Sequence, residues 1–325
     1  MNKTIAIIGG IVLGVFVLML GSGLFFMRAM DSKAEEGLFV ISRTNQLDTN
    51  KRLQESGYIR SPLALTFARL TTLRFGEIQP GGYKLSKSKD ARKLITILTS
   101  EPQLKWITIP EGLRKEEIGE RLAKEIHWDN EALEKWNTTY TAMEFDYREG
   151  VYFPDTYLIP VGENGLDTAK RMINRFNERF AGYPEKFAEQ NVLWTSALKI
   201  ASIVQREAAG KEDMPLIAGI LWNRLLNDQP LEIDATIQYA RGNTGSGWWA
   251  PIKASDIDDI DSPYNTYKHK GLPPTPISNP GIDAIDAVLN PTETDCYYYL
   301  HDKDRQIHCA KTLEEHEANI DKYLK

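Results

Sequence analysis

The chain has 325 residues, of which 42% are hydrophobic and 26% are charged, and its net charge at pH 7 is -6. This is the balance of an ordinary globular protein, and the length is sufficient for two domains. Because the charge is negative and no dense basic run could displace counterions along phosphates, a nucleic-acid-binding surface is excluded and no nucleic acid partner is expected.

Residues 4–27 contain no charged side chain. As a helix this run is roughly 36 Å long, which is enough to cross a hydrocarbon core of about 30 Å. The alternative is a cleaved signal peptide, with the small residues 21–23 as its cleavage site. The apolar run is longer than the core of a signal peptide and continues through Phe26, so we expect a retained transmembrane helix.

A small unit of helices and strands is expected after the apolar run. Residues 38–60 indicate a strand followed by a short helix. Residues 61–73 indicate a second helix, whose apolar side chains recur at helical spacing on one stripe, namely Leu63, Phe67, Leu70 and Leu73.

A turn at residues 80–82 then precedes a short strand at residues 83–85. Ser88 or Asp90 can cap the helix that follows and that ends at Leu98. Beyond it, residues 106–125 predict a strand, a turn and an amphipathic helix, and residues 168–187 predict another helix.

The stretch from Thr195 to Leu226 predicts a helix, a break and a second helix. Ile200, Ile203 and Val204 recur at helical spacing, and Glu207 falls on the same stripe in the last turn. Gly210 should end the first helix. Asp213 is the expected N-cap of the second helix, and Pro215 fits its first turn.

A glutamate on an apolar stripe should have a raised pKa, because burial disfavours the charged carboxylate. A general acid that works near neutral pH requires this property. The alternative is a boundary residue, either exposed or paired with Arg206 or Lys211, since carboxylates are common at helix ends. The local pattern leaves both interpretations open.

The two cysteines, Cys296 and Cys309, flank a segment that reads as a β-hairpin with its turn near residues 302–304. Folding the hairpin at that turn places the cysteines opposite each other. An oxidising compartment permits a disulfide if the Cα atoms approach closely enough, and two free thiols are the alternative. We predict that the cysteines are bonded.

Five segments resemble, in order, the motifs of the endolytic murein transglycosylases of the MltG/YceG-like family. The first is EGVYFPDTY, at residues 149–157, and the second is ASIVQREAAGKEDMPLIAGILWNRL, at residues 201–225. LEIDATIQYARG at residues 231–242 and SPYNTYKHKGLPPTPISNPG at residues 262–281 follow. The fifth is the C-terminal segment from Tyr297 to Leu324.

The resemblance implies an α+β fold in three parts. Residues 1–30 would form a cytoplasmic stub and a transmembrane helix, residues 31–104 a LysM-like subdomain, and residues 105–325 the mixed α+β catalytic domain. The protein would be a single-pass protein of the cell (inner) membrane with a cytoplasmic N-terminus and a periplasmic body. The LysM-like subdomain would bind glycan strands or serve only as a spacer.

The resemblance also implies a reaction without water. An acid protonates the glycosidic oxygen between MurNAc and GlcNAc in peptidoglycan, and the same group then takes the proton from the 6-hydroxyl of the sugar, which closes a 1,6-anhydro ring. One carboxyl can serve both steps because the nucleophile is part of the substrate. By family position this carboxyl is Glu207. The chain departs from the family pattern at Gln205, where a glutamate is common.

Ten further residues are candidate substrate-binding residues because they match the family motifs or carry suitable groups. They are Gln205, Asn223, Arg224, Asp234, Glu149, Asp155, Tyr264, Asn265, Thr266 and Tyr267. The tyrosines offer aromatic faces for a sugar ring, and the amide and hydroxyl groups suit its N-acetyl group. Structural roles are the alternative for the acids: Asp155 could satisfy turn amides, and Asp234 could cap a helix or pair with Arg224.

No metal site and no cofactor are expected, since the five histidines show no metal-ligand spacing. A serine or cysteine nucleophile has no motif to support it. The family implies peptidoglycan strands as substrate, the cell membrane as anchor and penicillin-binding proteins as partners. The alternative function is a non-catalytic, membrane-tethered glycan-binding scaffold, in which Gln205 marks lost activity.

Overall fold

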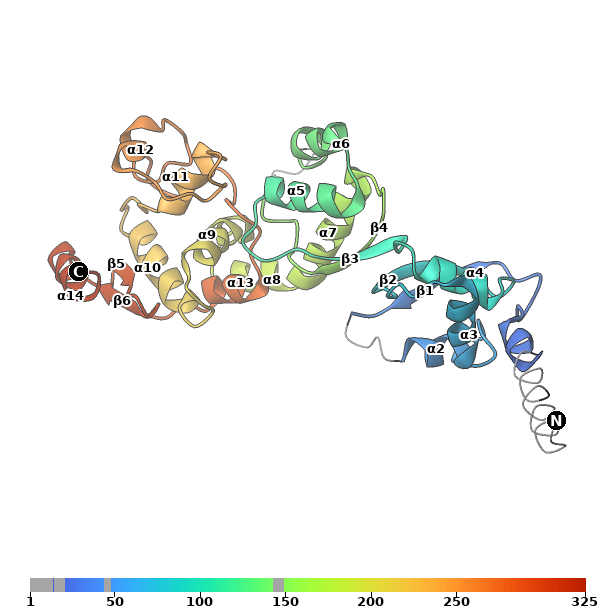
Figure 1. Ribbon diagram of the computed structural model, residues 1–325. Coiled ribbons are helices and arrows are strands. Elements are labelled where there is room, and N and C mark those ends of the chain that lie inside the picture. The colour runs from blue at the N-terminus through green and yellow to red at the C-terminus, as the bar shows by residue number, and fades with distance from the viewer. Residues whose placement is uncertain (1–13, 15–20, 44–47, 143–148) are drawn as a thin grey trace. The chain divides into compact units, whose positions relative to one another are not determined.

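The computed structural model describes residues 14, 21–43, 48–142 and 149–325 (Figure 1). By its internal contacts the chain divides into two compact units. The first comprises residues 1–107 and 157–162, and the second comprises residues 108–156 and 163–325. Both helices and strands occur, so the expected mixed α+β class is confirmed.

The predicted transmembrane helix falls largely on residues outside the described part of the chain. Residues 21–27, its C-terminal end, are helical. Among the residues that the structure describes, no helix has both the length and the apolar character needed to span a bilayer.

In its described residues, the first unit is a sheet in the order β1-β2-β3-β4 with the helices α2, α3 and α4, besides the helical residues 21–27. Strands β1 and β2 are antiparallel, with Glu36 opposite Ser86 and Ile41 opposite Gly81. The Asp90 side chain caps α4 by accepting a hydrogen bond from the Lys93 N–H, as one of the two predicted caps. The elements are β1 (Glu36–Ile41), α2 (Thr49–Glu55), α3 (Leu63–Thr72), β2 (Gly81–Ser86), α4 (Ala91–Leu98), β3 (Leu104–Thr108) and β4 (Thr156–Pro160).

Helix α3 forms where it was predicted, but only Phe67 of the predicted apolar stripe packs against the core. The core takes the other face, where Ala64, Leu65 and Ala68 are buried against α4 and the sheet. Leu63 and Leu70 are each more than half exposed. Small side chains allow close packing of α3 on its neighbours, so the buried face is the one that carries alanines.

The second unit is mainly helical and ends in a hairpin followed by a helix. Its elements are α5 (Lys115–Ile126), α6 (Asn130–Lys135), the π-helical turn η1 (Trp136–Tyr140), α7 (Gly165–Phe180), α8 (Tyr183–Glu189), α9 (Trp194–Glu207), α10 (Met214–Leu226), α11 (Asp234–Arg241), α12 (Ala254–Asp259), α13 (Ile282–Leu289), β5 (Tyr298–His301), β6 (Ile307–Ala310) and α14 (Leu313–Tyr323). The single helix predicted over residues 168–187 is in fact α7 and α8. Gly182 separates the two helices because its φ of 84° is incompatible with a continuous right-handed helix. Glycine adopts this left-handed conformation without steric cost.

Helices α9, α10 and α13 pack against one another and form the centre of this unit. Ile200, Ile203 and Val204 of α9 are fully buried, as their spacing predicted. A Cβ at Gly219 of α10 would lie 2.2 Å from the Thr292 carbonyl oxygen, so only glycine permits this close approach. The helix that carries Glu207 is therefore held from several sides.

The break between α9 and α10 lies where it was expected, with Pro215 in the first turn of α10, but α9 ends at Glu207 and not at Gly210. Asp213 precedes the helix, but its side chain does not cap it. The Asp213 carboxylate instead lies 3.1 Å from Nε2 of His301 on β5. This contact ties the C-terminal hairpin to the loop after α9.

Candidate active site

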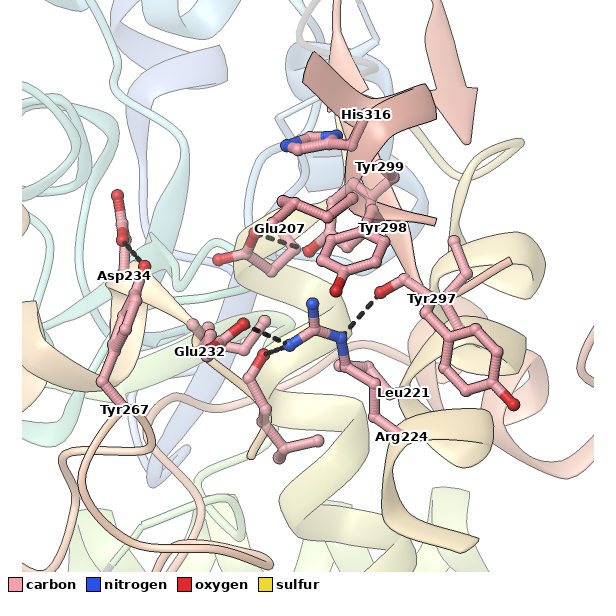
Figure 2. Close-up of a pocket in the computed structure, with 14 residues that line it drawn as sticks. Glu207, Leu221, Arg224, Glu232, Asp234, Tyr267, Tyr297, Tyr298, Tyr299 and His316 are labelled. Carbon is pink, nitrogen blue, oxygen red and sulfur yellow. Dashed lines mark hydrogen bonds and ion pairs between the residues drawn. The ribbon is translucent and has the colours of Figure 1, made fainter. Parts of the chain in front are cut away.

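A cavity of about 460 Å³ opens beside the C-terminal end of α9 (Figure 2). Its walls come from α9, α10, the start of α11, strand β5 and α14, together with the loops before α11 and after α12. The lining residues are Glu207, Ile220, Leu221, Arg224, Leu231, Glu232, Ile233, Asp234, Tyr267, Tyr297, Tyr298, Tyr299, Leu313 and His316.

Glu207 is the last residue of α9, and its carboxyl group faces this cavity. The hydroxyl group of Tyr299 donates a hydrogen bond of 2.8 Å to Oε2 of Glu207. Burial raises the pKa of the Glu207 carboxyl, the Tyr299 hydrogen bond opposes this increase, and the charge of Asp234 adds to it. Glu207 can therefore hold a proton at a pH where an exposed glutamate has lost it.

Asp234 and Tyr267 form a second polar pair across the cavity from Glu207 and Tyr299 (Figure 2). The Tyr267 hydroxyl donates to Oδ1 of Asp234 at 2.6 Å. Burial and the carboxylate of Asp234 raise the pKa of Tyr267, so its hydroxyl stays protonated and continues to donate. This pair brings together two of the candidate residues, one from the start of α11 and one from the segment at residues 262–267.

Arg224 connects two segments of the cavity wall, the residues before β5 and the loop before α11. Its Nε donates to the Tyr297 carbonyl at 2.6 Å, and its Nη1 contacts the Leu231 carbonyl at 3.1 Å and Oε2 of Glu232 at 2.8 Å. The guanidinium also lies 4.9 Å from the centre of the Tyr298 ring. Arg224 pairs with Glu232, so the expected alternative of an Asp234–Arg224 pair is wrong.

Strand β5 contributes residues that the sequence analysis missed. Tyr298 and Tyr299 line the cavity from this strand, and His316 of α14 stacks on the Tyr298 ring at 5.4 Å. Burial lowers the pKa of His316, which favours the neutral ring. The run of three tyrosines at residues 297–299, which begins the fifth motif, was the available signal, because aromatic side chains are suited to sugar binding.

The hairpin that bears Tyr299 is fastened at several points. The predicted disulfide joins Cys296 to Cys309, with their Cα atoms 5.9 Å apart. At the turn, the Arg305 guanidinium donates to the Ala209 carbonyl in the loop after α9. With the His301–Asp213 contact, these bonds hold β5 against the end of the helix that carries Glu207.

Asn223 and Gln205 bind the backbone around the site. Nδ2 of Asn223 donates to the carbonyls of Thr294 and Cys296, at 2.7 and 3.1 Å, and so fixes the segment that leads into the hairpin. Oε1 of Gln205 accepts from the Gly281 N–H at 3.0 Å, at the start of α13. An amide accepts this bond without adding a negative charge close to Glu207.

Glu149 and Asp155 lie away from the cavity. Glu149 is fully buried and accepts hydrogen bonds from the Lys115 N–H at 2.9 Å and from Nδ2 of Asn279 at 2.6 Å. Burial raises the pKa of Glu149 to about 8. Asp155 accepts from the Thr156 N–H at 2.7 Å, which matches the turn role weighed for it, and pairs with Arg175 at 2.6 Å.

The side chains of residues 264–266, directly before Tyr267, form hydrogen bonds with neighbouring segments. Asn265 is fully buried and donates to the carbonyls of Ile257 and Ile260. The Thr266 hydroxyl accepts from the Ile233 N–H at 3.0 Å, just before α11. The Tyr264 hydroxyl bonds that of Thr275 at 2.7 Å. Thr266 thus holds the backbone that leads into Asp234, and none of these three side chains lines the cavity.

In the part of the chain that the structure describes, no three His, Cys, Asp or Glu side chains are grouped so that they could hold a metal ion. The polar groups that line the cavity include the carboxyls of Glu207, Glu232 and Asp234 and the tyrosine hydroxyls. A carboxyl whose pKa burial raises, a hydroxyl group that donates to it and nearby aromatic side chains are suited to protonating an oxygen of a bound sugar.

The proteins that resemble the chain include two endolytic murein transglycosylases and one solved structure. An endolytic murein transglycosylase of Streptococcus pneumoniae is 29% identical over 314 residues, which cover 86% of this chain and 57% of that protein. An endolytic murein transglycosylase of Bacillus subtilis is 32% identical over 268 residues, which cover 76% of this chain and 73% of the relative. The crystal structure of a yceG-like protein from Listeria monocytogenes aligns with a TM-score of 0.60 at 25% identity, over 88% of this chain and 99% of that chain.

The chain thus spans little more than half the length of the pneumococcal relative. The family is nevertheless shown by the extent of the match, since residues 39–322 fit the YceG-like family. The predicted resemblance is confirmed, and this protein belongs to the YceG-like family.

Proposed function

We propose that this protein is a membrane-anchored lytic transglycosylase. It cleaves the β-1,4 bond between MurNAc and GlcNAc in nascent peptidoglycan and leaves 1,6-anhydroMurNAc ends. Family membership and the names of the pneumococcal and Bacillus relatives support this proposal. The observation that carries it is the carboxyl of Glu207, whose pKa burial raises and which lies at the wall of a cavity lined by tyrosines.

In the first step, protonated Glu207 donates its proton to the glycosidic oxygen, and the bond from C1 to that oxygen breaks. The Tyr299 hydroxyl holds the resulting carboxylate through its hydrogen bond. In the second step, the carboxylate takes the proton of the 6-hydroxyl, whose oxygen bonds to C1. Glu207 is then protonated again, and no water is consumed.

The remaining groups of the cavity orient the sugar. Tyr267 offers a ring face, and Asp234 and Glu232 offer acceptors for sugar hydroxyls. Because Arg224 fixes the backbone on both sides of the cavity, these groups keep their positions when the substrate leaves.

The deciding experiment compares the products of wild type and Glu207→Gln on purified glycan strands by mass spectrometry. The amide has the volume of the carboxyl but cannot donate a proton, so we expect retained strand binding and loss of cleavage by a factor of at least 10². Wild-type products should end in 1,6-anhydroMurNAc.

Three outcomes would contradict the proposal. Products heavier by one water would identify a hydrolase and require a second carboxylate such as Asp234 to activate water. Undiminished anhydro product from Glu207→Gln would remove Glu207 from this role. Strands bound but cut by neither protein would favour the scaffold alternative, and Gln205→Glu would then test whether activity returns.

We also propose where the protein lies in the cell and what its cuts do there. The uncharged run at residues 4–27 anchors the protein in the cell (inner) membrane, with a cytoplasmic N-terminus and a periplasmic body. The cuts are internal and end strand elongation beside penicillin-binding proteins, while the LysM-like unit contacts glycan or acts as a spacer. A deletion strain should therefore have longer glycan strands than its parent.

A further inference from the structure

Arg206 directly precedes Glu207 in α9, and its guanidinium is turned to other partners. Nη1 of Arg206 donates to the Gly112 carbonyl at 3.3 Å, and the guanidinium carbon lies 3.9 Å from the centre of the Trp249 ring. In the part of the chain that the structure describes, Arg206 forms no ion pair with Glu207. The pairing that the sequence left open as the alternative role of Glu207 therefore does not form.

Trp249 is held in place by α5. It lies in the segment at residues 242–253, between α11 and α12, and its indole Nε1 donates to Oε2 of Glu117 at 2.8 Å. The same carboxylate oxygen accepts a hydrogen bond from the Arg114 N–H at the start of α5, at 3.1 Å. Glu117 thus fixes the indole, and Arg206 stacks on a ring of fixed orientation.

The stack does not satisfy the hydrogen-bonding capacity of Arg206. Nε of its guanidinium is buried and has no hydrogen-bond partner among the described residues. A buried donor without a partner costs free energy, and a carboxylate is the partner that a guanidinium binds most strongly. The carboxylates whose charges act on Arg206 are those of Glu117 and Glu207. Glu117 already accepts the bonds of Trp249 and Arg114, so an Arg206 released from the stack would gain most from Glu207.

An ion pair with Arg206 would change the protonation of Glu207. Burial raises the pKa of this carboxyl, the Tyr299 hydrogen bond and the charge of Arg206 lower it, and the charge of Asp234 raises it. The other charged or titratable side chains around the cavity are Arg224, Glu232, Tyr267, Tyr297, Tyr298 and His316. A guanidinium that closes on Glu207 would favour the carboxylate, whereas a general acid must start protonated.

We propose that Trp249 is a positioning residue for the reaction, because its ring holds the Arg206 guanidinium on Gly112 and away from Glu207. The acid then begins each cycle unpaired and can give its proton to the glycosidic oxygen. This inference rests on the proposed function, in which Glu207 is the general acid. A tryptophan that only packs its segment on α5 would affect the stability of the protein but not the protonation of Glu207.

The test measures the pKa of Glu207 in two ways, on the full chain in detergent micelles. Carbon-13 NMR of protein labelled at the glutamate carboxyl carbon follows Glu207 directly, and its signal is identified by its absence from Glu207→Gln. The pH dependence of kcat/KM for anhydro product formation follows the same group through activity. The variants are Trp249→Leu and, as the matched control, Trp248→Leu, whose indole lies over Arg114 and donates to Glu120.

In Trp249→Leu we expect the pKa of Glu207, and with it the alkaline limb of the pH profile, to fall by about one pH unit as Arg206 pairs with the carboxylate. Trp248→Leu should leave both at their wild-type values. In the Arg206→Gln background, Trp249→Leu should have no further effect, because no charge is left to release. Trp249→Phe keeps a ring face but loses the indole N–H, so it should cause a smaller fall that is also absent in the Arg206→Gln background.

An unchanged pKa of Glu207 in Trp249→Leu would overturn the proposal. An equal fall in Trp248→Leu, or the same fall in the Arg206→Gln background, would overturn it too, because the effect would then not pass through the stack. Should Trp249→Leu fail to fold, the comparison of Trp249→Phe with wild type in the two backgrounds decides in the same way.

The NMR measurement also separates this inference from the proposed function. If the pKa falls as expected but Glu207→Gln still cuts strands, the positioning of Arg206 stands and the catalytic role of Glu207 fails. If Glu207→Gln is inactive and the pKa does not move in Trp249→Leu, the catalytic role stands and Trp249 only packs its segment.

Discussion

The Tyr299 hydroxyl is the contact through which the C-terminal hairpin acts on Glu207. Its hydrogen bond lowers the pKa that burial raises, because it favours the carboxylate. In Tyr299→Phe we expect the pKa of Glu207 to rise further. Since the general acid must start protonated, the alkaline limb of the pH–rate profile should move to higher pH.

The same substitution should lower the maximum rate by about tenfold to a hundredfold, because a small displacement of the acid is costly. The measurement is the rate of anhydro product formation against pH. Tyr298→Phe is the matched control, since it removes a hydroxyl from the same strand and cavity but spares the bond to Glu207. An unchanged pH profile in Tyr299→Phe would show that the hydroxyl does not position the acid.

Glu149 predicts a pH dependence of stability that is separate from catalysis. Its pKa in the folded protein is about 8, mainly because it is buried. Between about pH 4.3, the ordinary glutamate value, and pH 8, the folded state keeps a proton that the unfolded state releases. The contribution of Glu149 is thus present at low pH and is lost as the pH rises, by up to about 1.4 kcal/mol per pH unit.

Glu149→Gln should remove this dependence, because an amide imitates the protonated carboxyl. The free energy of unfolding in urea, measured at pH 5 and pH 7.5, should fall more in wild type than in the variant. Anhydro product formation serves as the control and should persist in the variant. Parallel curves for the two proteins would show that Glu149 is ionised in the folded state.

Individual residues were predictable from sequence to the extent that their neighbours in the chain decide their position. The place of Glu207 at the end of a buried stripe follows from helical spacing. Its bond to Tyr299 joins residues 92 positions apart, and no local pattern contains that pairing. Asp234 and Tyr267 were both candidates, but only the fold shows that they contact each other.

At the scale of elements, the disulfide-closed hairpin should control how firmly Tyr299 is held. The bond closes a loop of 13 residues, which is worth about 3 kcal/mol in the chain-entropy model. The double variant Cys296→Ser, Cys309→Ser should therefore lose activity at a lower temperature than wild type, as the hairpin leaves the end of α9.

Activity against temperature, with and without a thiol reductant, measures this effect. The reductant should move the wild-type curve to that of the double variant and should leave the variant unchanged. Amide hydrogen exchange in β5 and β6 gives an independent reading, since local opening should increase there first. Equal thermal inactivation of both proteins would contradict the prediction.

Element positions were predicted well, and the orientation of their faces less well. The strand at β1 and the helices α3, α4 and α5 lie where the periodicity placed them. In α3, however, spacing identified an apolar stripe without showing which face is buried. Two faces of that helix are apolar. The face with Ala64 and Ala68 is the buried one because small side chains allow closer packing. Which face packs more closely depends on the neighbouring elements, and the local sequence does not contain that information.

At the scale of the whole molecule, the length allowed two domains and the family resemblance implied an α+β fold, and the structure divides the chain into two units. Strand β4 returns to the first unit after an excursion of almost fifty residues through the second. Domain boundaries predicted from sequence divide the chain into consecutive segments. They therefore cannot include a strand such as β4, which belongs to the first unit although it follows part of the second.

The final prediction concerns topology and follows from the charge-free run at residues 4–27. We expect the chain after Met30 to lie outside the cytoplasm on an uncleaved helix, because the run is longer than the core of a signal peptide. Protease added to spheroplasts should digest the body and leave a small membrane-held stub. A tag at the N-terminus should be protected until the membrane is permeabilised. A protected body would refute the orientation, and a mature N-terminus near Gly23 would refute retention of the helix.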